Sequence, residues 1–292
     1  MMLRERGTQT ASRIRWVVVL GCVFGGSLAW SADKVTGMLL AKDAVTGLNR
    51  SAVVEAKLIR RGLAGDVGLG GEPLELVHNG QVIAKTMTGG DGRALFQFTP
   101  KARGMVTLTV RVGDNPRVTA AESMTNVASW EQRTPILAVE VAALMDESES
   151  SSVMPSLVPP DKRRKPLPDA ADELSKLTQF YYNLLYIAVA EHDPSGGFST
   201  NDRIRTWLKE HKFPLGHILV LPTSTDALGL KLDEFHAAGW KTLKVGIGRS
   251  RAFAEAFLER RLDVVIVPEP AQGEVPRKAK LAKGWKEVRK KL

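Results

Sequence analysis

Cysteine is almost absent from this chain of 292 residues, in which Cys22 is the single example. Cys22 lies in an N-terminal apolar segment that we expect to be removed on export, so the mature protein is predicted to contain no thiol. Disulfide bonds and zinc sites built from cysteine are therefore excluded. A chain without thiols is compatible with an oxidising compartment, but the absence alone does not place the protein in one.

A strong excess of charge is also missing from most of the chain. The formal net charge is +9, but residues 277–292 alone contribute eight Lys or Arg and one Glu. The remainder is nearly balanced, so we expect no general nucleic-acid-binding surface. With 43% hydrophobic and 25% charged residues the composition is that of a globular protein, and the length suggests two domains.

Residues 1–31 have the features of a secretory signal. A basic start is followed by an uncharged apolar core, Trp16 to Leu28, which is short for a membrane span, and then by the small-x-small site Ala29-Trp30-Ser31. We predict cleavage before Ala32, with lipid attachment at Cys22 or a retained N-terminal anchor as alternatives. Each of these places the bulk of the protein outside the cytoplasm, in the periplasm or cell envelope.

The next region changes from an irregular to an alternating pattern. Residues 32–51 show no clear period and are predicted to be a leader. Residues 52–132 alternate apolar and polar side chains in short runs, separated by turn signals such as Asn79-Gly80 and Asp91-Gly92. Short strands at this spacing, joined by Asn-Gly and Asp-Gly turns, predict a β-sandwich.

This alternating region resembles the immunoglobulin-like domains of bacterial surface and envelope proteins. The resemblance rests on Gly71-Glu72-Pro73-Leu74 and on Thr88 followed by Asp91-Gly92-Arg93-Ala94-Leu95-Phe96, and it covers roughly Ala52 to Ser129. It implies a spacer or adhesion module. A domain that only stabilises its neighbour is the simpler interpretation, because a fold does not by itself specify a function.

Residues 133–292 are predicted to form an α/β domain. Thr134–Leu144 is an apolar run typical of a buried parallel strand. Residues 146–170, rich in Ser, Glu and Pro, are predicted to be a disordered insert. Strands and helices then alternate, including a helix capped by Asn201 or Asp202, and this alternation is typical of a doubly wound parallel sheet.

Leu243–Pro270 is the best-defined part of this domain. An apolar run is followed by Gly246 and Gly248, predicted to form a turn, then by a helix capped by Ser250 and a second, β-branched run. A run that is apolar at every position must be covered on both faces, so the segment predicts a βαβ unit. Ligands bind at the carboxyl ends of such strands, which places the expected functional site at residues 246–250.

The order of these elements resembles the haloacid dehalogenase-like (HAD) superfamily, and within it the lipin-type phosphatidate phosphatase domains. The segments that carry the resemblance are Leu185-Tyr186-Ile187-Ala188, Arg205-Thr206-Trp207-Leu208, His211 to Gly216 and Gly246-Ile247-Gly248-Arg249. It covers about residues 135–270. It implies a Rossmannoid parallel-sheet fold whose active members use an Asp-x-Asp pair and Mg²⁺.

Residue by residue, the resemblance implies a site that has lost its chemistry. In the best match Glu140 takes the position of the nucleophilic Asp, and Ala142 takes that of the Asp that shuttles the proton. Glu is longer than Asp by one C–C bond, which displaces the attacking oxygen, and Ala has no proton to transfer. Arg249 stands where carboxylates should hold Mg²⁺, and its charge would repel the ion.

A rebuilt site is the alternative. A second match puts Glu191 in the position of the nucleophile and keeps Asp193 as the acid/base, and the family's lysine corresponds to Lys231 or Lys244. If the domain were a divergent phosphatase acting on lipid or sugar phosphates, Glu140, or Glu191 with Asp193, together with Lys231 would be its catalytic residues. Mg²⁺ would then be its cofactor.

Two further features suggest binding. Gly246, Gly248, Arg249 and Ser250 stand at a helix start, where backbone N–H groups and an Arg fork can hold an anion. At the C-terminus a helix is predicted over residues 277–292, with an apolar face formed by Leu281, Trp285, Val288 and Leu292. We expect this face to dock on the α/β domain, with an anionic membrane surface as the alternative partner.

The sequence therefore predicts an exported envelope protein in which an immunoglobulin-like β-sandwich precedes a catalytically degenerate HAD-like α/β domain. We expect a binding or scaffolding module whose partner is an unknown protein or an anionic ligand. It is expected to need no metal or other cofactor. A divergent phosphatase and a membrane-associated protein are the alternatives.

Overall fold

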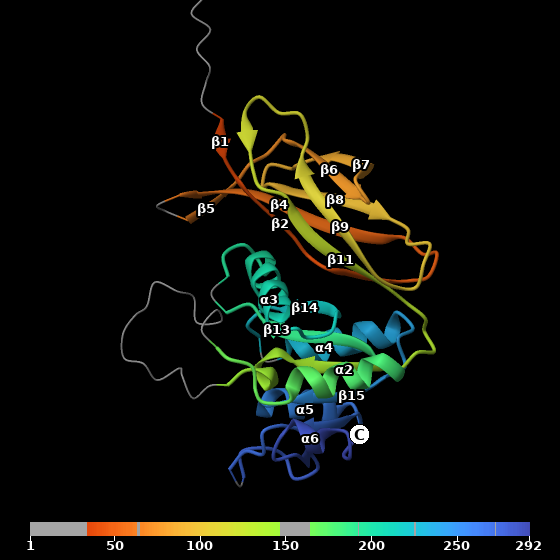
Figure 1. Cartoon of the computed structure of the whole chain (residues 1–292). Helices are drawn as coiled ribbons and strands as arrows, with labels where there is room; N and C mark the ends of the chain where they lie inside the picture. The colour runs from red at the N-terminus through yellow and green to blue at the C-terminus, as the bar shows by residue number, and fades with distance from the viewer. Residues whose placement is uncertain (1–33, 63–64, 147–163, 192, 225, 272) are drawn as a thin grey trace, which may run out of the picture. The chain divides into compact units, whose positions relative to one another are not determined.

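The computed structural model describes residues 34–62, 65–146, 164–191, 193–224, 226–271 and 273–292 (Figure 1). The predicted signal at residues 1–31, with Cys22, and residues 147–163 of the predicted insert lie outside the described residues. Lys34–Leu292 forms one compact unit. None of the helices in the described ranges is long and apolar enough to cross a membrane.

The first part of this unit is a β-sandwich, as the sequence predicts. It has two main sheets, whose strands are hydrogen-bonded to their neighbours in the order given. One contains β3 (Ala44–Gly47), β11 (Ser123–Trp130), β9 (Gly104–Val112), β6 (Pro73–His78) and β7 (Gln81–Met87). The other contains β2 (Met38–Ala41), β4 (Ala52–Gly62) and β5 (Gly65–Gly68), with β8 (Arg93–Phe98) also paired to β4. A short pair is formed by β1 (Val35–Thr36) and β10 (Val118–Thr119).

The sandwich begins earlier than the sequence predicts. Residues 32–51, expected to be a leader, contain β1, β2 and β3, and β3 pairs in parallel with β11. The alternating pattern is missing because β2 is covered on both faces. Leu39 and Ala41 lie in the sandwich core, whereas Leu40 packs against Ile59 and Phe198.

The second part is an α/β domain built on a parallel sheet. The described strands follow the spatial order β14 (His217–Leu221), β13 (Asn183–Val189), β12 (Ile136–Glu140), β15 (Leu243–Gly248), β16 (Asp263–Ile266) and β17 (Lys280–Leu281). Side chains alternate between two cores, so that Leu137 and Val139 face one and Ile136 and Ala138 face the other. The prediction of a sheet buried on both faces is confirmed.

Different helices cover the two faces of this sheet (Figure 1). The core that contains Leu137 includes side chains from α2 (Ala170–Phe180), α3 (Phe198–Glu210) and α6 (Trp285–Val288). The core that contains Ile136 includes side chains from α4 (Ala227–Ala237) and α5 (Arg251–Glu259), and also Trp130 at the end of β11.

Both ends of the predicted insert are part of the fold. Strand β12 stops at Glu140 and continues as a 3₁₀ turn, η1 (Val141–Leu144). After the undescribed segment, the N–H of Leu167 donates to the Leu144 carbonyl at 2.8 Å. Met145 and Pro166 form an isolated antiparallel β-bridge. Helix α2 then starts at Ala170, so residues 164–170 belong to the α/β domain.

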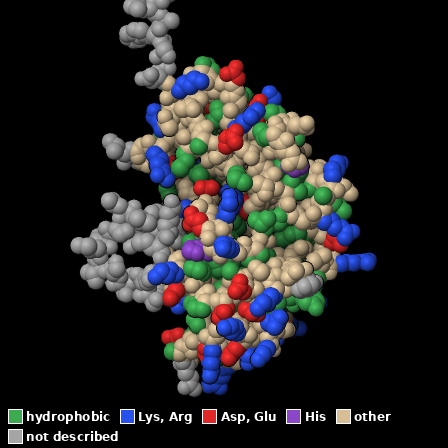
Figure 2. Space-filling view, in the orientation of Figure 1, with side chains coloured by type: hydrophobic (Ala, Val, Ile, Leu, Met, Phe, Trp, Pro, Cys, Tyr) green, Lys and Arg blue, Asp and Glu red, His purple; other side chains and the backbone are tan. Residues whose placement is uncertain are grey.

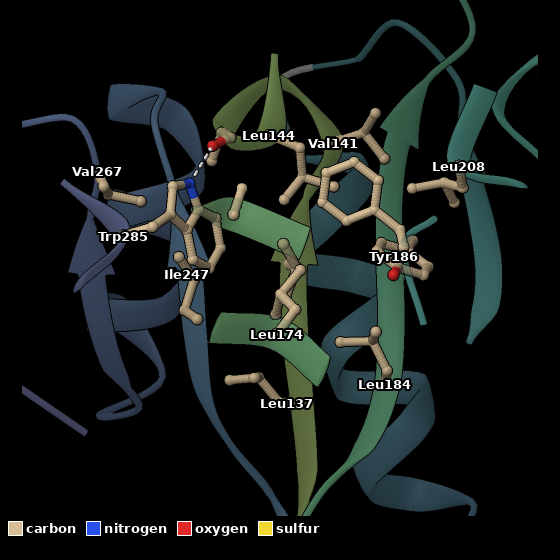
Figure 3. Close-up of a cluster of buried hydrophobic side chains, with 14 of the residues drawn as sticks. Leu137, Val141, Leu144, Leu174, Leu184, Tyr186, Leu208, Ile247, Val267 and Trp285 are labelled. Atoms are coloured by element: carbon tan, nitrogen blue, oxygen red, sulfur yellow. Dashed lines mark hydrogen bonds between the residues drawn. The ribbon is translucent and has the colours of Figure 1, made fainter. Parts of the chain in front are cut away.

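The C-terminal segment is not one amphipathic helix over residues 277–292. Leu281 lies in edge strand β17, and helix α6 is a single short turn. Trp285 is buried in one core of the α/β domain (Figure 3). Val288 is buried in the same core, Leu292 packs against it, and Leu281 packs against the other core. The apolar side chains that a membrane-binding helix would need are therefore inside the domain.

The surface around the C-terminal helices is mixed in charge. Lys and Arg side chains lie among Asp and Glu side chains over the part of the domain that holds α5 and α6 (Figure 2). Some of these are ion pairs, such as Lys286 with Asp169 at 3.3 Å and Lys280 with Asp263 at 3.6 Å. The basic residues of the C-terminal segment are thus partly compensated by nearby carboxylates.

A buried ion pair links the sandwich to α3. Asp43, between β2 and β3, has a fully buried side chain, and its Oδ1 lies 2.7 Å from Nη2 of Arg205. The same oxygen accepts the N–H of Asn126 at 3.0 Å. Beside the pair lies a small apolar cluster, which consists of Leu40, Ile59 and Phe198. Sandwich and α/β domain therefore share both a polar and an apolar contact.

Lowering the pH from 7 to 5 is expected to destabilise the protein through His217. Burial lowers the pKa of His217 from 6.5 to about 4, although the nearby Asp43 carboxylate acts in the opposite direction. Between these two values the unfolded chain binds a proton that the folded chain does not, so stability is lost as the pH falls. The share due to His217 over this interval is about 2 kcal/mol.

The measurement is urea unfolding at both pH values for the wild type and for His217→Gln. Other groups titrate in both proteins, so the quantity of interest is the difference between the two pH-dependent losses. The variant should lose less stability than the wild type on acidification. Equal losses would contradict a neutral, buried His217.

Candidate functional site

A cavity lies at the carboxyl ends of the parallel strands, where the sequence places the site. Its volume is about 700 Å³, which is within the range of small-molecule sites. Residues at the strand ends and at the starts of α3, α4 and α5 form its walls. The lining consists of Glu140, Val141, Ala142, Met145, Arg164, Ile187, Ala188, Val189, Glu191, Thr200, Arg203, Ile204, Leu221, Pro222, Ser224, Ala227, Leu228, Ser250, Ala252 and Phe253.

Glu140 is held by the N-terminus of α5. Its Oε2 accepts the backbone N–H groups of Arg249 at 2.6 Å and Ser250 at 2.8 Å, and its Oε1 accepts the Ser250 hydroxyl at 2.5 Å. The Ser250 oxygen in turn accepts the N–H of Phe253 at 3.2 Å, so the predicted cap of α5 is confirmed. A carboxylate is the group that the positive end of a helix favours. Here that carboxylate belongs to the protein itself.

The donors predicted to hold a ligand anion are thus already engaged. The backbone N–H groups of Arg249 and Ser250 and the Ser250 hydroxyl all donate to Glu140. The guanidinium of Arg249 donates from Nη1 to the Met145 carbonyl at 3.1 Å, so it lies against the main chain rather than in the cavity lining. An external anion could use these backbone groups only by displacing Glu140.

Gly246 and Gly248 are strand residues, so the predicted glycine turn is wrong. Both belong to β15, and a Cβ at Gly246 would lie 2.7 Å from the ring of Phe257. At Gly248 the added atom would lie 2.2 Å from the ring of Phe253. The two rings are stacked, with centroids 4.7 Å apart. These glycines are therefore required by the close approach of α5 to the sheet, and they do not indicate a phosphate-binding loop.

Asp193 and Glu191 have different surroundings. Asp193 Oδ2 accepts the N–H of Thr200 at 2.8 Å and its hydroxyl at 2.7 Å, and Oδ1 accepts the N–H of Ser195 at 2.9 Å. Burial acts to raise the pKa of Asp193, but these bonds from Ser195 and Thr200 outweigh it and hold the pKa below the ordinary value. Glu191 is exposed and contributes to the cavity lining.

Asp193 therefore organises the start of α3. That helix begins at Phe198, earlier than the Asn201 or Asp202 cap that the sequence predicts. Its first N–H groups are satisfied from the preceding loop, by Asp193 at Thr200 and by the hydroxyl of Ser195 at Ser199. Local side-chain caps are the usual signal for a helix start, and here the capping residues lie several positions upstream.

The remaining residues of the phosphatase alternative do not gather at the cavity. Lys231 on α4 pairs with Glu234, and neither Lys231 nor Lys244 belongs to the lining. Ala142 does line the cavity but has no group that could carry a proton. In the described part of the chain, no group of three or more His, Cys, Asp or Glu is placed to hold a metal ion. With both oxygens of Glu140 engaged, the donor set does not fit Mg²⁺.

Comparisons with known proteins find only weak similarity. No protein-family model matches the sequence, and no curated protein matches it. Among solved structures, a D,D-heptose 1.7-bisphosphate phosphatase from B. bronchiseptica is similar over 54% of this chain and 97% of its own, at 13% identity and with a TM-score of 0.42.

Two further solved structures are similar to about a third of the chain. A CARDB domain from Pyrococcus furiosus matches 32% of this chain and 92% of its own at 18% identity, with a TM-score of 0.24. Fibronectin(III)-like modules from Clostridium thermocellum match 32% of this chain and 94% of their own at 11% identity, with a TM-score of 0.22. The chain itself combines a β-sandwich with an α/β domain built on a parallel sheet.

The cationic residues of the cavity in the α/β domain were missed by sequence reasoning. They are Arg164 and Arg203. Arg164 belongs to a basic cluster that is typical of a solvated linker, and Arg203 is one of several charged residues in a predicted helix. Neither pattern distinguishes a cavity wall from an exposed surface, because the segments that bring the two residues together are far apart in the sequence.

Proposed function

We propose that this chain is an exported binding protein whose HAD-like domain has lost phosphatase chemistry, and that the cavity at the carboxyl ends of its strands holds a ligand. One observation carries the proposal. The carboxylate of Glu140, which corresponds to the family's nucleophile, caps α5 through the N–H groups of Arg249 and Ser250 and the Ser250 hydroxyl.

This arrangement opposes nucleophilic attack for two reasons. Attack on phosphorus needs a carboxylate oxygen whose lone pair points at the substrate, whereas both oxygens of Glu140 accept hydrogen bonds from the protein. Turning Glu140 toward a substrate would also leave the first N–H groups of α5 without acceptors, which is costly in a partly buried site. Ala142, in the position of the proton shuttle, supplies no acid to the leaving group.

The experiment is a phosphatase assay on the purified mature chain. With Mg²⁺ present and p-nitrophenyl phosphate or a short-chain phosphatidate as substrate, we expect no release of phosphate above that of buffer. Glu140→Gln and Glu191→Gln should give the same result as the wild type. Turnover by the wild type that either substitution abolishes would replace this proposal with the divergent phosphatase.

Glu140→Ala is expected to lower the free energy of unfolding by about 1–3 kcal/mol, because it removes the acceptor for three donors at the start of α5. Urea unfolding followed by circular dichroism measures this change. Glu191→Ala is the matched control, since Glu191 is an exposed carboxylate at the same cavity, and its effect should stay within about 0.5 kcal/mol. Equal effects of the two substitutions would mean that Glu140 does not stabilise α5.

A further inference from the structure

Arg164 and Arg203 are brought to one side of the cavity by α3. The indole N–H of Trp207, a buried residue of α3, donates to the Arg164 carbonyl at 2.9 Å and so fixes the Arg164 main chain against the helix. Arg203 precedes Trp207 by one helical turn, on the same face of α3. Both arginines line the cavity. One of the two arginines therefore belongs to α3, and the main chain of the other is held against that helix.

The guanidinium N–H groups of Arg164 and Arg203 are suited to binding an anion. A guanidinium carries five N–H donors in a planar fork that matches a carboxylate or phosphate. Arg203 uses Nη2 to donate to the Thr200 hydroxyl at 3.1 Å. The Nε of Arg164 is buried and makes no hydrogen bond to any described residue. A buried donor is costly when it has no acceptor, and an anionic group in the cavity would supply one.

The rest of the cavity is largely apolar. Strands β13 and β14 and the starts of α3, α4 and α5 each contribute hydrophobic side chains to the lining. The principal ones are Ile187, Ile204, Leu221, Leu228 and Phe253. Walls of this kind favour a ligand with hydrocarbon surface, because burying such surface is the main source of affinity in small-molecule sites.

The charged residues of the cavity favour an anion beside Arg164 and Arg203 rather than at the start of α5. Glu140 is held by the positive end of α5, so the donors there are engaged. Glu191 lies in the loop after β13 and is exposed to solvent. An anion near Arg249 and Ser250 would meet the Glu140 carboxylate, whereas an anion between Arg164 and Arg203 would meet two cations.

We infer that the cavity binds an organic anion whose charged end pairs with Arg164 and Arg203 and whose apolar body lies against the walls formed by Ile187, Leu221, Leu228 and Phe253. The inference rests on the proposed binding function and names the ligand class for it. It also moves the anion site from residues 246–250, where the sequence places it, to the α3 side of the cavity.

Titration calorimetry of the mature chain with straight-chain carboxylates tests this ligand class. Octanoate should bind roughly 250-fold more tightly than butanoate, because it has four more CH₂ groups and each buried CH₂ contributes about fourfold in affinity. Octanol should bind more weakly than octanoate by at least about tenfold, since it lacks the charge that pairs with arginine.

Variants locate the site. Arg203→Met and Arg164→Met should each weaken octanoate binding by about tenfold or more. Lys209→Met, which removes an exposed cation from the same helix outside the cavity, should leave it unchanged. Ala227→Phe, which places a ring at the cavity wall, should weaken octanoate more than butanoate. Circular dichroism establishes that each variant is folded.

Each alternative result overturns the inference. Equal affinity for butanoate and octanoate would indicate a simple anion site, and equal affinity for octanol with no effect of the arginine variants would indicate a neutral ligand. Binding of none of these probes would remove the ligand class altogether. Carboxylates contain no phosphoester, so these results are independent of the phosphatase assay, in which turnover would overturn the proposed function instead.

Discussion

Replacing Trp285 by alanine should lower the free energy of unfolding by about 3–5 kcal/mol, the range for large aromatic side chains in cores. Trp285 is 2% exposed and packs in the core that includes Leu137, Ile247 and Val267 (Figure 3). Its indole N–H donates to the carbonyl of Ala143, just after β12, at 3.0 Å. The substitution would leave a cavity and also a buried carbonyl without its donor.

Two companion variants make this test specific, with urea unfolding as the measurement. Trp285→Phe keeps most of the buried surface but removes the hydrogen bond, so it should cost less than Trp285→Ala. Lys286→Ala removes the adjacent, 75% exposed side chain and should change stability by about 0.5 kcal/mol or less. If Trp285→Ala and Lys286→Ala had equal effects on stability, the C-terminal segment would not be part of the core. Its apolar side chains would then be available to bind a membrane.

Asp43→Ala is expected to cost about 3–5 kcal/mol of stability, because it leaves one member of a buried ion pair without its partner. The Asp43 side chain is fully buried and that of Arg205 is 13% exposed. Asp43 also accepts the N–H of Asn126, so its loss would remove an acceptor from the sandwich as well as from α3. The effect should therefore reach both parts of the chain.

A second carboxylate on the same arginine provides the control. Asp202 lies 3.4 Å from Nη1 of Arg205 but is 46% exposed, so Asp202→Ala should cost no more than about 1 kcal/mol. Adding Arg205→Met to Asp43→Ala should recover part of the loss, since it removes the unpaired charge. Chemical unfolding measures all three proteins. A loss from Asp43→Ala no larger than that from Asp202→Ala would contradict a buried link between sandwich and α3.

The fold was predictable where one local pattern dominates. Val264, Val265 and Ile266 of β16 are apolar in succession, because Val265 faces one core and its two neighbours face the other. Turns such as Asn79-Gly80 mark the hairpins of the sandwich. Strand β2 was missed because both of its faces are buried, one in the sandwich core and the other against Phe198, so its residues do not alternate. The prediction of a C-terminal helix was wrong because Leu281 and Trp285 face different cores despite their helical spacing.

The site was predictable in its position but not in its chemistry. The carboxyl ends of parallel strands converge in any such sheet, so Glu140 and Ser250 were expected at one edge. The hydrogen bonds between Glu140 and Ser250 depend on the length of the Glu140 side chain and on how closely α5 approaches the sheet. Arg164 and Arg203 could not be assigned, because their proximity depends on the contact of Trp207 with a segment far away in sequence.

The hydrogen bonds between Glu140 and α5 make this helix end self-complementing, because the protein supplies its own anion there. Glu140→Asp would shorten the side chain by one C–C bond and draw the carboxylate back from Arg249 and Ser250. The first N–H groups of α5 would then be open to an external anion. A single substitution would thus create an anion-binding site at a helix end that is closed in the wild type.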